Sequence, residues 1–213
     1  MDENQKTHDL QASYDTVAEE YAQRIYDELK DKPLDRQLLD RFAREAQPPI
    51  CDMGTGPGHV ARYLHDRGAE VFGIDLSQGM VEQARQLNPT IEFRQGNMLA
   101  LDAPDNSWGA ITAFYSIIHV PRTEVITALR GFKRVLRPGG LILLAFHIGD
   151  ETLHMEDWWD KKVSLDFNFF TPQEVQGYLI SSGLEVLEMI QRDPYPDVEH
   201  PSQRCYIFAR KPL

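Results

Sequence analysis

The sequence contains few cysteines and no long apolar stretch. Cys51 and Cys205 are its only cysteines among 213 residues, and their number and spacing fit neither a disulfide framework nor a zinc site. The longest apolar run, Leu141–Phe146, is far too short to cross a bilayer. The first residues, MDENQKTHD, lack the basic start and apolar stretch of a signal peptide. These absences predict a cytoplasmic protein with no membrane partner and no metal site.

Positive charge is also scarce. The chain has 22 lysines and arginines against 33 aspartates and glutamates, for a net charge of -11. A surface this acidic repels phosphate backbones, so we expect no nucleic-acid partner. One basic cluster has the spacing expected for the solvent-exposed face of a helix. It comprises Arg130, Lys133, Arg134 and Arg137.

Hydrophobic periodicity predicts helices first and then an alternation of strands and helices. Residues 11–30 place apolar side chains every three or four positions, and Pro33 opens a second helix that Pro48-Pro49 ends. The predicted strands are 50–53, 70–74, 91–94, 109–114, 141–146, 184–192 and 204–209. The predicted helices among them are 59–66, 77–87, 122–136 and one opened by the capping box Thr171-Pro172-Gln173-Glu174. Residues 148–170 are expected to form a loop.

This alternation predicts an α/β fold in one domain that spans residues 1–213. Strands that alternate with helices form a mostly parallel sheet with helices on both faces. In such sheets ligands bind beyond the carboxyl ends of the strands. The loops at that edge are therefore where we look for the functional site.

A glycine-rich loop follows the first predicted strand. The segment Gly54-Thr55-Gly56-Pro57-Gly58 lets the backbone turn tightly and approach a ligand. Asp75 ends the next strand, where an acid suits the two hydroxyls of a ribose. Loop and acid together predict a nucleoside ligand. His59 stands where the dinucleotide pattern G-x-G-x-x-G needs its third glycine, which argues against NAD.

Three segments in this order resemble motifs of the class I S-adenosylmethionine-dependent methyltransferases. Residues 50–58, Ile-Cys-Asp-Met-Gly-Thr-Gly-Pro-Gly, resemble motif I, and residues 71–77 with Met80 resemble motif II. Residues 132–140 resemble the stretch before the fifth strand of that family. Tyr14-Asp15, with Ala18 and Tyr21, resembles the helical lead-in of its small-molecule, type 11-like branch.

The resemblance implies a Rossmann-like, seven-stranded, mostly parallel sheet whose last strand is antiparallel, preceded by an N-terminal helical cap. It divides the chain into that cap (residues 1–47), a cofactor-binding core (48–147), and substrate-side loops with closing strands (148–213). The implied cofactor is S-adenosylmethionine, which becomes S-adenosylhomocysteine.

The resemblance also implies which residues contact the cofactor. Gly54 and Gly56 would face its methionine part and Asp75 its ribose. Asn97 stands where the family often has aspartate, and an amide can still donate and accept hydrogen bonds there. The expected cofactor-binding residues are Tyr14, Tyr21, Asp52, Gly54, Thr55, Gly56, Asp75, Leu76, Met80, Gly96, Asn97, Met98, Phe114 and Tyr115.

The acceptor of the methyl group is expected beside the ends of the fourth and fifth strands. Methyl transfer relies on holding the acceptor close and aligned, and a base is needed only if the acceptor must lose a proton. His119 and His147 lie at these two ends, where either could be the base or could simply hydrogen-bond a loop. Tyr14 is the third candidate catalytic residue.

Two segments are expected to form the acceptor pocket. Residues 148–170 are rich in aromatic side chains, which could form an apolar wall of the pocket or a small satellite core. Residues 193–201 should lie on the same edge if the last strand is antiparallel. The expected substrate-binding residues are Tyr115, His119, His147, Trp158, Trp159, Tyr195 and His200.

The sequence therefore predicts an enzyme, an S-adenosylmethionine-dependent methyltransferase (EC 2.1.1.-). Its acceptor is expected to be a small aromatic or apolar molecule, methylated on oxygen, nitrogen or an activated carbon. A methyltransferase that acts on a macromolecule and a non-catalytic S-adenosylmethionine-binding protein remain open alternatives. The expected partner is a small molecule, and the expected state is a monomer or homodimer.

Overall fold

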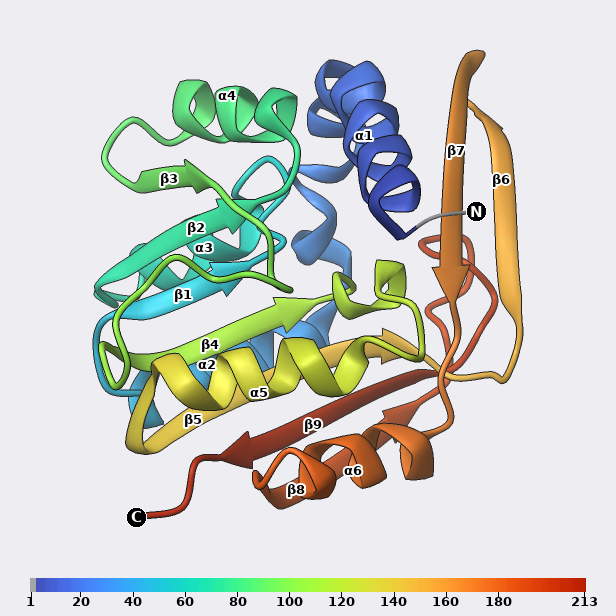
Figure 1. Ribbon diagram of the computed structural model, residues 1–213. Helices are drawn as coiled ribbons and strands as arrows, with labels where there is room; N and C mark the ends of the chain where they lie inside the picture. The colour runs from blue at the N-terminus through green and yellow to red at the C-terminus, as the bar shows by residue number, and fades with distance from the viewer. Residues whose placement is uncertain (1–2) are drawn as a thin grey trace.

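A seven-stranded sheet forms the centre of the molecule (Figure 1), in a computed structural model that describes residues 3–213. The order of the strands is β3-β2-β1-β4-β5-β9-β8. The strands are β1 (Ile50–Met53), β2 (Val71–Asp75), β3 (Glu92–Gln95), β4 (Trp108–Phe114), β5 (Leu136–His147), β8 (Glu185–Arg192) and β9 (Arg204–Arg210). The first five pair in parallel, and β9 runs antiparallel to β5 and β8. The predicted Rossmann-like sheet with its antiparallel last strand is confirmed.

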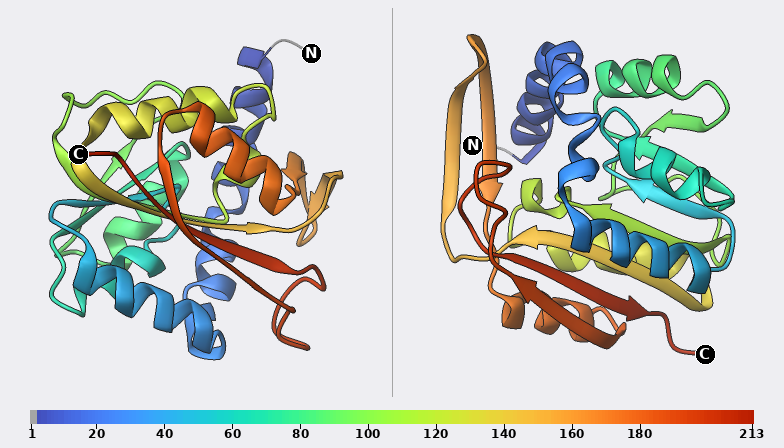
Figure 2. Two further views of the ribbon diagram at one scale, coloured as in Figure 1. Left: turned by 90° about the horizontal axis from the view of Figure 1, so that it is seen from below. Right: turned by 180° about the vertical axis from the view of Figure 1, so that it is seen from behind.

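Helices cover both faces of this sheet (Figure 2). The helices α2 (Pro33–Glu45), α3 (His59–His65) and α4 (Gln78–Leu87) bury their apolar sides against one face. The helices α5 (Val125–Val135) and α6 (Pro172–Ser181) do so against the other. Both core clusters contain side chains with no exposed surface, such as Phe42 and Phe132. This burial of apolar surface on two faces is the main stabilising contribution expected for such a fold.

The N-terminal helix α1 (Glu3–Ile25) caps the carboxyl edge of the sheet, followed by the short 3-10 helix η1 (Glu28–Asp31) (Figure 1). Its position is fixed by Asp15, whose Oδ1 accepts hydrogen bonds from the Ser77 hydroxyl at 2.5 Å and the Gly79 amide at 2.8 Å. The predicted cap is thus helical, although the helix predicted at 11–30 begins earlier and ends at Ile25. No helix among the described residues is both long and apolar enough to cross a membrane.

Residues 148–170 do not form the loop that we predicted. They contain an antiparallel hairpin of β6 (Thr152–Trp158) and β7 (Lys161–Asn168). The two turn residues, Trp159 and Asp160, have φ values of 51° and 61°, as in a type I′ turn. Such turns usually contain Asn-Gly or Asp-Gly, so Trp-Asp gave no recognisable turn signal.

The hairpin lies alongside α1 in two views (Figures 1 and 2). Ser13 joins the two elements, because its hydroxyl accepts from the Ser164 amide at 2.8 Å and donates to the Ser164 carbonyl at 3.3 Å. A small apolar cluster fills the space between them. It contains Val17, Ala18, Met80, Val163 and Leu165. Helix and hairpin therefore form one layer over the carboxyl edge of the sheet.

Candidate active site

A cavity of about 510 Å³ lies at the carboxyl edge of the sheet, under α1 and the hairpin. Its volume falls within the range of small-molecule sites, roughly 300–1,000 Å³. Most of the residues that we predicted to bind a cofactor line it. Those residues are Tyr14, Tyr21, Gly54, Gly56, Asp75, Leu76, Met80, Gly96, Asn97, Met98, Phe114 and Tyr115, with His119 from the 3-10 helix η2 (Ile117–His119).

The glycine loop reaches the cavity because its residues have no side chain there. Gly54 has a φ of +69°, and a Cβ atom at this position would lie 2.3 Å from the Cβ of Ser116. At Gly56, with a φ of +53°, a Cβ would meet the Tyr21 ring at 3.8 Å. Only glycine adopts the left-handed region without strain. The loop therefore presents bare backbone to any ligand in the cavity.

Asp75 connects this loop to the end of β2. Its Oδ2 accepts a hydrogen bond from the Gly56 amide at 2.8 Å, and its Oδ1 accepts one from the Ser77 amide at 2.9 Å. Burial raises the pKa of Asp75 to about 6, although both amides oppose the rise. Each carboxylate oxygen can accept a second hydrogen bond, so the group can still receive hydroxyls of a ligand.

Asp52 and Thr55 do not face the cavity, which corrects two of the expected cofactor contacts. Asp52 is 1% exposed and lies beneath the loop. Its carboxylate accepts from the hydroxyls of Thr55 at 2.6 Å and Thr112 at 2.9 Å, and from the Ala61 amide at 3.1 Å. A buried carboxylate needs such donors, and here they set the shape of the loop. Asp52 acts on the site through the backbone.

Tyr14 and His119 form a hydrogen-bonded pair in the cavity. The Tyr14 hydroxyl lies 2.7 Å from Nε2 of His119, and Nδ1 of His119 lies 3.0 Å from the carbonyl oxygen of Asp166. A carbonyl can only accept, so Nδ1 carries the proton and Nε2 accepts from Tyr14.

Burial keeps both members of this pair uncharged. It lowers the pKa of His119 to about 4 and raises the pKa of Tyr14 well above its usual value. At neutral pH the pair is thus a phenol that donates to the free lone pair of a neutral imidazole.

Trp158 and Trp159 do not line the cavity, which corrects two expected substrate contacts. Of the two alternatives left open by the sequence, these tryptophans belong to the satellite core. The two indoles stack with ring centroids 4.6 Å apart. They pack edge-on against Tyr21, with centroids at 5.7 and 6.1 Å, and Trp158 also contacts Tyr14 at 6.1 Å. The tryptophans therefore pack against the two cavity tyrosines from outside the cavity.

His147, Tyr195 and His200 also lie outside the cavity, which corrects three expected substrate contacts. Nδ1 of His147 lies 2.8 Å from the Ser202 hydroxyl, and its ring stacks on Phe169 with centroids 5.0 Å apart. Burial, aided by the charge of nearby Arg204, lowers the pKa of His147 to about 3. The Tyr195 hydroxyl accepts from the Leu34 amide at 3.0 Å, and His200 packs edge-on against His147. Among the three expected catalytic residues, only Tyr14 and His119 reach the cavity.

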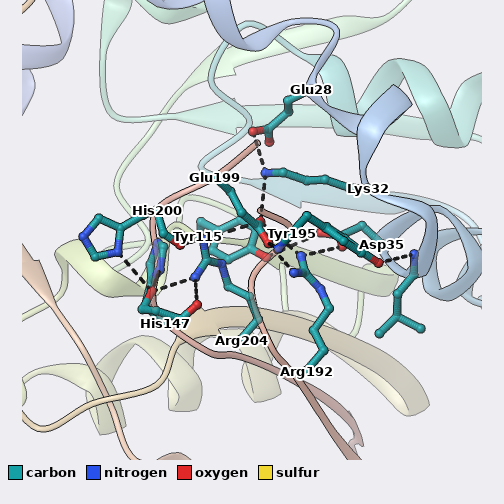
Figure 3. Close-up of polar contacts among 12 residues, drawn as sticks. Glu28, Lys32, Asp35, Tyr115, His147, Arg192, Tyr195, Glu199, His200 and Arg204 are labelled. Atoms are coloured by element: carbon teal, nitrogen blue, oxygen red, sulfur yellow. Dashed lines mark hydrogen bonds and ion pairs between the residues drawn. The ribbon is translucent and has the colours of Figure 1, made fainter. Parts of the chain in front are cut away.

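These residues surround a buried network of charged side chains (Figure 3). Glu199 is paired with Arg192, with Lys32 at 3.7 Å and with Arg204 at 3.4 Å. Arg192 also pairs with Asp35 at 3.0 Å, and each of these five side chains is at most 9% exposed. The network joins α2 and the segment before it to residues 192–204. It fixes the part of the chain that lies behind Tyr115, whose hydroxyl lies 3.1 Å from that of Tyr206.

Comparisons with known proteins identify the family that this site belongs to. Residues 50–140 match a family model described as a methyltransferase domain. The chain is 28% identical over 140 residues to a demethylmenaquinone methyltransferase from Beutenbergia cavernae, covering 65% of this chain and 58% of that protein. It is 26% identical over 164 residues to a malonyl-[acyl-carrier protein] O-methyltransferase from Serratia marcescens, covering 76% and 64%. Residues 50–140 therefore belong to the methyltransferase domain family, and the wider chain is similar to curated methyltransferases.

Solved structures share the fold of this chain. The DhpI–SAH complex superposes with a TM-score of 0.78 at 20% identity, covering 99% of each chain. A SAM-dependent methyltransferase from Methanosarcina mazei gives a TM-score of 0.73 at 18% identity, covering 81% of this chain and 97% of that one.

The chain spans only 39% to 58% of the length of three demethylmenaquinone methyltransferases that it matches.

The residues that line the cavity fit the cofactor of this family, S-adenosylmethionine. The glycine loop leaves room that a Cβ would occupy, and Asp75 offers carboxylate oxygens for ribose hydroxyls. Leu76, Met80 and Met98 line the same cavity and would give an adenine ring an apolar surface. Within residues 3–213, no group of three or more His, Cys, Asp or Glu side chains could hold a metal ion.

Several of the residues that line the cavity were not anticipated from the sequence. Ser164, Asp166 and Asn168 line the cavity from β7. They alternate with Val163, Leu165 and Phe167, which is the period of two expected for a strand with one polar face. That alternation was a signal for these residues. Glu28 and His59 also line the cavity, and no local sequence pattern marks them.

Proposed function

We propose that this methyltransferase transfers a methyl group from S-adenosylmethionine to an oxygen or nitrogen atom of a small acceptor. The observation that carries the proposal is the hydrogen bond between Tyr14 and His119 inside the cavity. In this pair Nε2 of His119 can accept a proton from the Tyr14 phenol. Both side chains line the same cavity as Gly54 and Asp75. An acceptor that must lose a proton needs such a pair.

The cofactor supplies a methyl group on a cationic sulfonium, whose sulfur keeps the bonding electron pair when the methyl group leaves. The acceptor gives its proton to the Tyr14 oxygen while the Tyr14 hydroxyl proton passes to Nε2 of His119. This nitrogen is free to take it, because Asp166 holds the other ring proton on Nδ1. Positive charge gained by His119 then replaces the charge lost from the sulfonium, so the net charge of the cavity is unchanged.

The acceptor side of the cavity supports a small molecule with an apolar body and a polar reacting group. Leu10, Val120 and Pro121 give this side apolar surface, and Ser164 and Asp166 add polar groups. The relatives described above act, by their names, on demethylmenaquinone and on a malonyl group carried by a protein. A net charge of -11 disfavours an RNA or DNA acceptor.

Methyl-labelled S-adenosylmethionine tests this function with panels of phenols and quinols, carboxylic acids and amines. We expect label to enter at least one small-molecule class and S-adenosylhomocysteine to form in equal amount. Label that appears only in protein or RNA would favour the macromolecular alternative. Binding of both cofactor forms in calorimetry, without transfer to any acceptor, would favour a non-catalytic binding protein.

A further inference from the structure

The residues that line the cavity fall into three groups, of which the proposed function uses two. Asp75 and Leu76 belong to the group expected to hold adenosine, and Tyr14 and His119 belong to the acceptor group. The third group lies beside the glycine loop and contains Tyr21, Glu28 and His59. Its place beside the loop follows from Tyr21, which packs over Gly56, and from His59, which comes directly after Gly58.

Glu28 is the charged member of this third group. Its Oε1 lies 3.2 Å from Nε2 of His59, and its Oε2 accepts from the Lys32 ammonium at 2.7 Å. Burial alone would raise the pKa of Glu28, but the hydrogen bonds from His59 and Lys32 outweigh burial and lower the pKa to about 2. Glu28 is therefore an ionised carboxylate at neutral pH, with lone pairs to spare on each oxygen.

The ammonium of Lys32 lies between the carboxylates of Glu28 and Glu199 (Figure 3). Lys32 does not line the cavity and is also paired with Glu199 at 3.7 Å. Glu199 is held in turn by Arg192 and Arg204. This buried network fixes Lys32, and through it Glu28, at a defined place on the wall. A ligand at this end of the cavity meets a carboxylate that is already oriented.

We propose that Glu28 binds the α-ammonium group at the methionine end of the cofactor, with Lys32 and His59 as its positioning residues. This inference rests on the proposed function. The cofactor sulfur carries an adenosyl group, a methyl group and an amino-acid chain. The adenosyl group is expected against the set of residues that contains Asp75 and Leu76, and the methyl group points to the set that contains Tyr14 and His119. The amino-acid chain is therefore expected against the third set, beside the glycine loop.

Two other acids lie near the loop, and neither is assigned to this role: Asp75 is expected to hold the ribose. Asp52 lies under the loop with its carboxylate bonded to Thr55, Thr112 and Ala61. An ammonium brings three donors, and a hydrogen bond to an ionised partner is among the stronger ones in proteins. Glu28 is the acid that the cavity offers at this end.

Calorimetry with three ligands tests the assignment through binding alone. S-adenosylhomocysteine carries the whole amino-acid chain, its deaminated analogue lacks only the ammonium, and 5′-methylthioadenosine lacks the entire amino-acid group. We expect the unchanged protein to bind the deaminated analogue at least about tenfold more weakly than S-adenosylhomocysteine. In the Glu28→Gln variant the two should bind alike, and the affinity for 5′-methylthioadenosine should be unchanged. Glu188→Gln, the same change at an exposed site, should leave all three affinities as they were.

The outcomes separate this proposal from the proposed function. Equal binding of S-adenosylhomocysteine and its deaminated analogue by the unchanged protein overturns the role of Glu28, even if the variant fails to fold. An equal loss of affinity for all three ligands in Glu28→Gln also overturns it, since that result means a purely structural role. Failure of the unchanged protein to bind any of the three ligands contradicts the proposed function itself.

Discussion

The carboxylate of Asp75 accepts a hydrogen bond from the backbone amide of Gly56 across 2.8 Å. These residues belong to two different sequence motifs, at the ends of neighbouring strands β1 and β2. One carboxylate therefore supports the shape of the glycine loop and is also available to a ribose. A change at Asp75 should affect the loop and the ligand together.

The charge of Asp75 should make cofactor binding depend on pH. Its pKa of about 6 lies above the usual value of about 3.9, so protonation removes an acceptor from the site as the pH falls through about 6. We expect the dissociation constant for S-adenosylhomocysteine to rise below that pH. In Asp75→Asn we expect this constant to be high at every pH and to change less with pH. Calorimetry between pH 5 and pH 8 measures this dependence. An unchanged affinity down to pH 5 would contradict the assignment.

The same raised pKa has the opposite effect on the stability of the unliganded protein. The folded state binds this proton more tightly than the unfolded chain does, so the stability that Asp75 contributes is complete below about pH 4. It is lost as the pH rises through about 6. Melting curves of the protein and of Asp75→Asn should therefore differ in their pH dependence between these two values.

Gly54→Ala should disrupt the site, whereas Gly177→Ala should stabilise the protein. A Cβ at Gly54 meets the Cβ of Ser116 at 2.3 Å in a left-handed backbone, but a Cβ at Gly177 meets nothing within 4 Å. Gly177 lies within α6, where alanine is favoured over glycine by roughly 0.5–1 kcal/mol. Urea denaturation should show this gain, and calorimetry should show that only Gly54→Ala weakens S-adenosylhomocysteine binding. Equal effects of the two changes would argue against the close approach at the loop.

Tyr14→Phe should lower kcat much more than it changes cofactor affinity. It removes the hydroxyl that we propose passes a proton to His119, and general acid–base groups contribute about 10²–10⁴ in rate. His119→Asn, which keeps a donor for the Asp166 carbonyl, should give a similar loss, and the double variant should be little worse than either one. Steady-state kinetics with the identified acceptor measures these effects. Additive losses would mean that the two residues do not act as a pair.

The neutral state of His119 predicts a further kinetic signature. Because burial lowers its pKa to about 4, the imidazole stays uncharged well below the usual histidine range. At saturating cofactor, kcat should show no step near pH 6.5 and should decline only as the pH approaches about 4. A step near 6.5 that disappears in His119→Asn would show that the pKa of His119 is not lowered.

Glu199→Gln should destabilise the protein far more than Glu188→Gln. Glu199 balances three buried cations, namely Lys32, Arg192 and Arg204, and removing one partner of a buried ion pair costs about 3–5 kcal/mol. Glu188 pairs with Arg41 at the surface, where such pairs contribute about 0–1 kcal/mol. Free energies of unfolding from urea titrations compare the two variants. Similar losses would mean that the buried network adds little to stability.

Local signals in the sequence were sufficient to predict most helices and strands. Ser77 caps α4 by accepting from the Met80 amide at 3.0 Å, and Thr171 with Glu174 forms the predicted capping box. These interactions involve residues three positions apart, so the sequence displays them directly. The glycine loop and Asp75 were predictable for the same reason, since the loop directly follows β1 and Asp75 is the last residue of β2.

The acceptor side depended on contacts that the sequence does not display. His119 and His147 both follow predicted strands, so the sequence does not distinguish them. The path of β7 brings the carbonyl oxygen of Asp166 to Nδ1 of His119 and not to His147. Asp35 and Arg192 are 157 residues apart, and their pairing follows from the packing of α2 against the closing strands. Tyr195 and His200 contact Glu199 and Arg204 of this network through their backbones. Residues of the hairpin line the cavity in their place.

The hairpin leaves the body of the protein and returns to it at nearly one point. Ile148 and Phe170, just outside its two strands, form a bridge with each other, and the central sheet completes its own hydrogen bonding without β6 or β7. Ser164, Asp166 and Asn168 reach the cavity from this inserted unit, whereas Gly54 and Asp75 belong to the sheet. Under the proposed function, changes confined to the hairpin should therefore alter the choice of acceptor and leave the cofactor half of the site as it is.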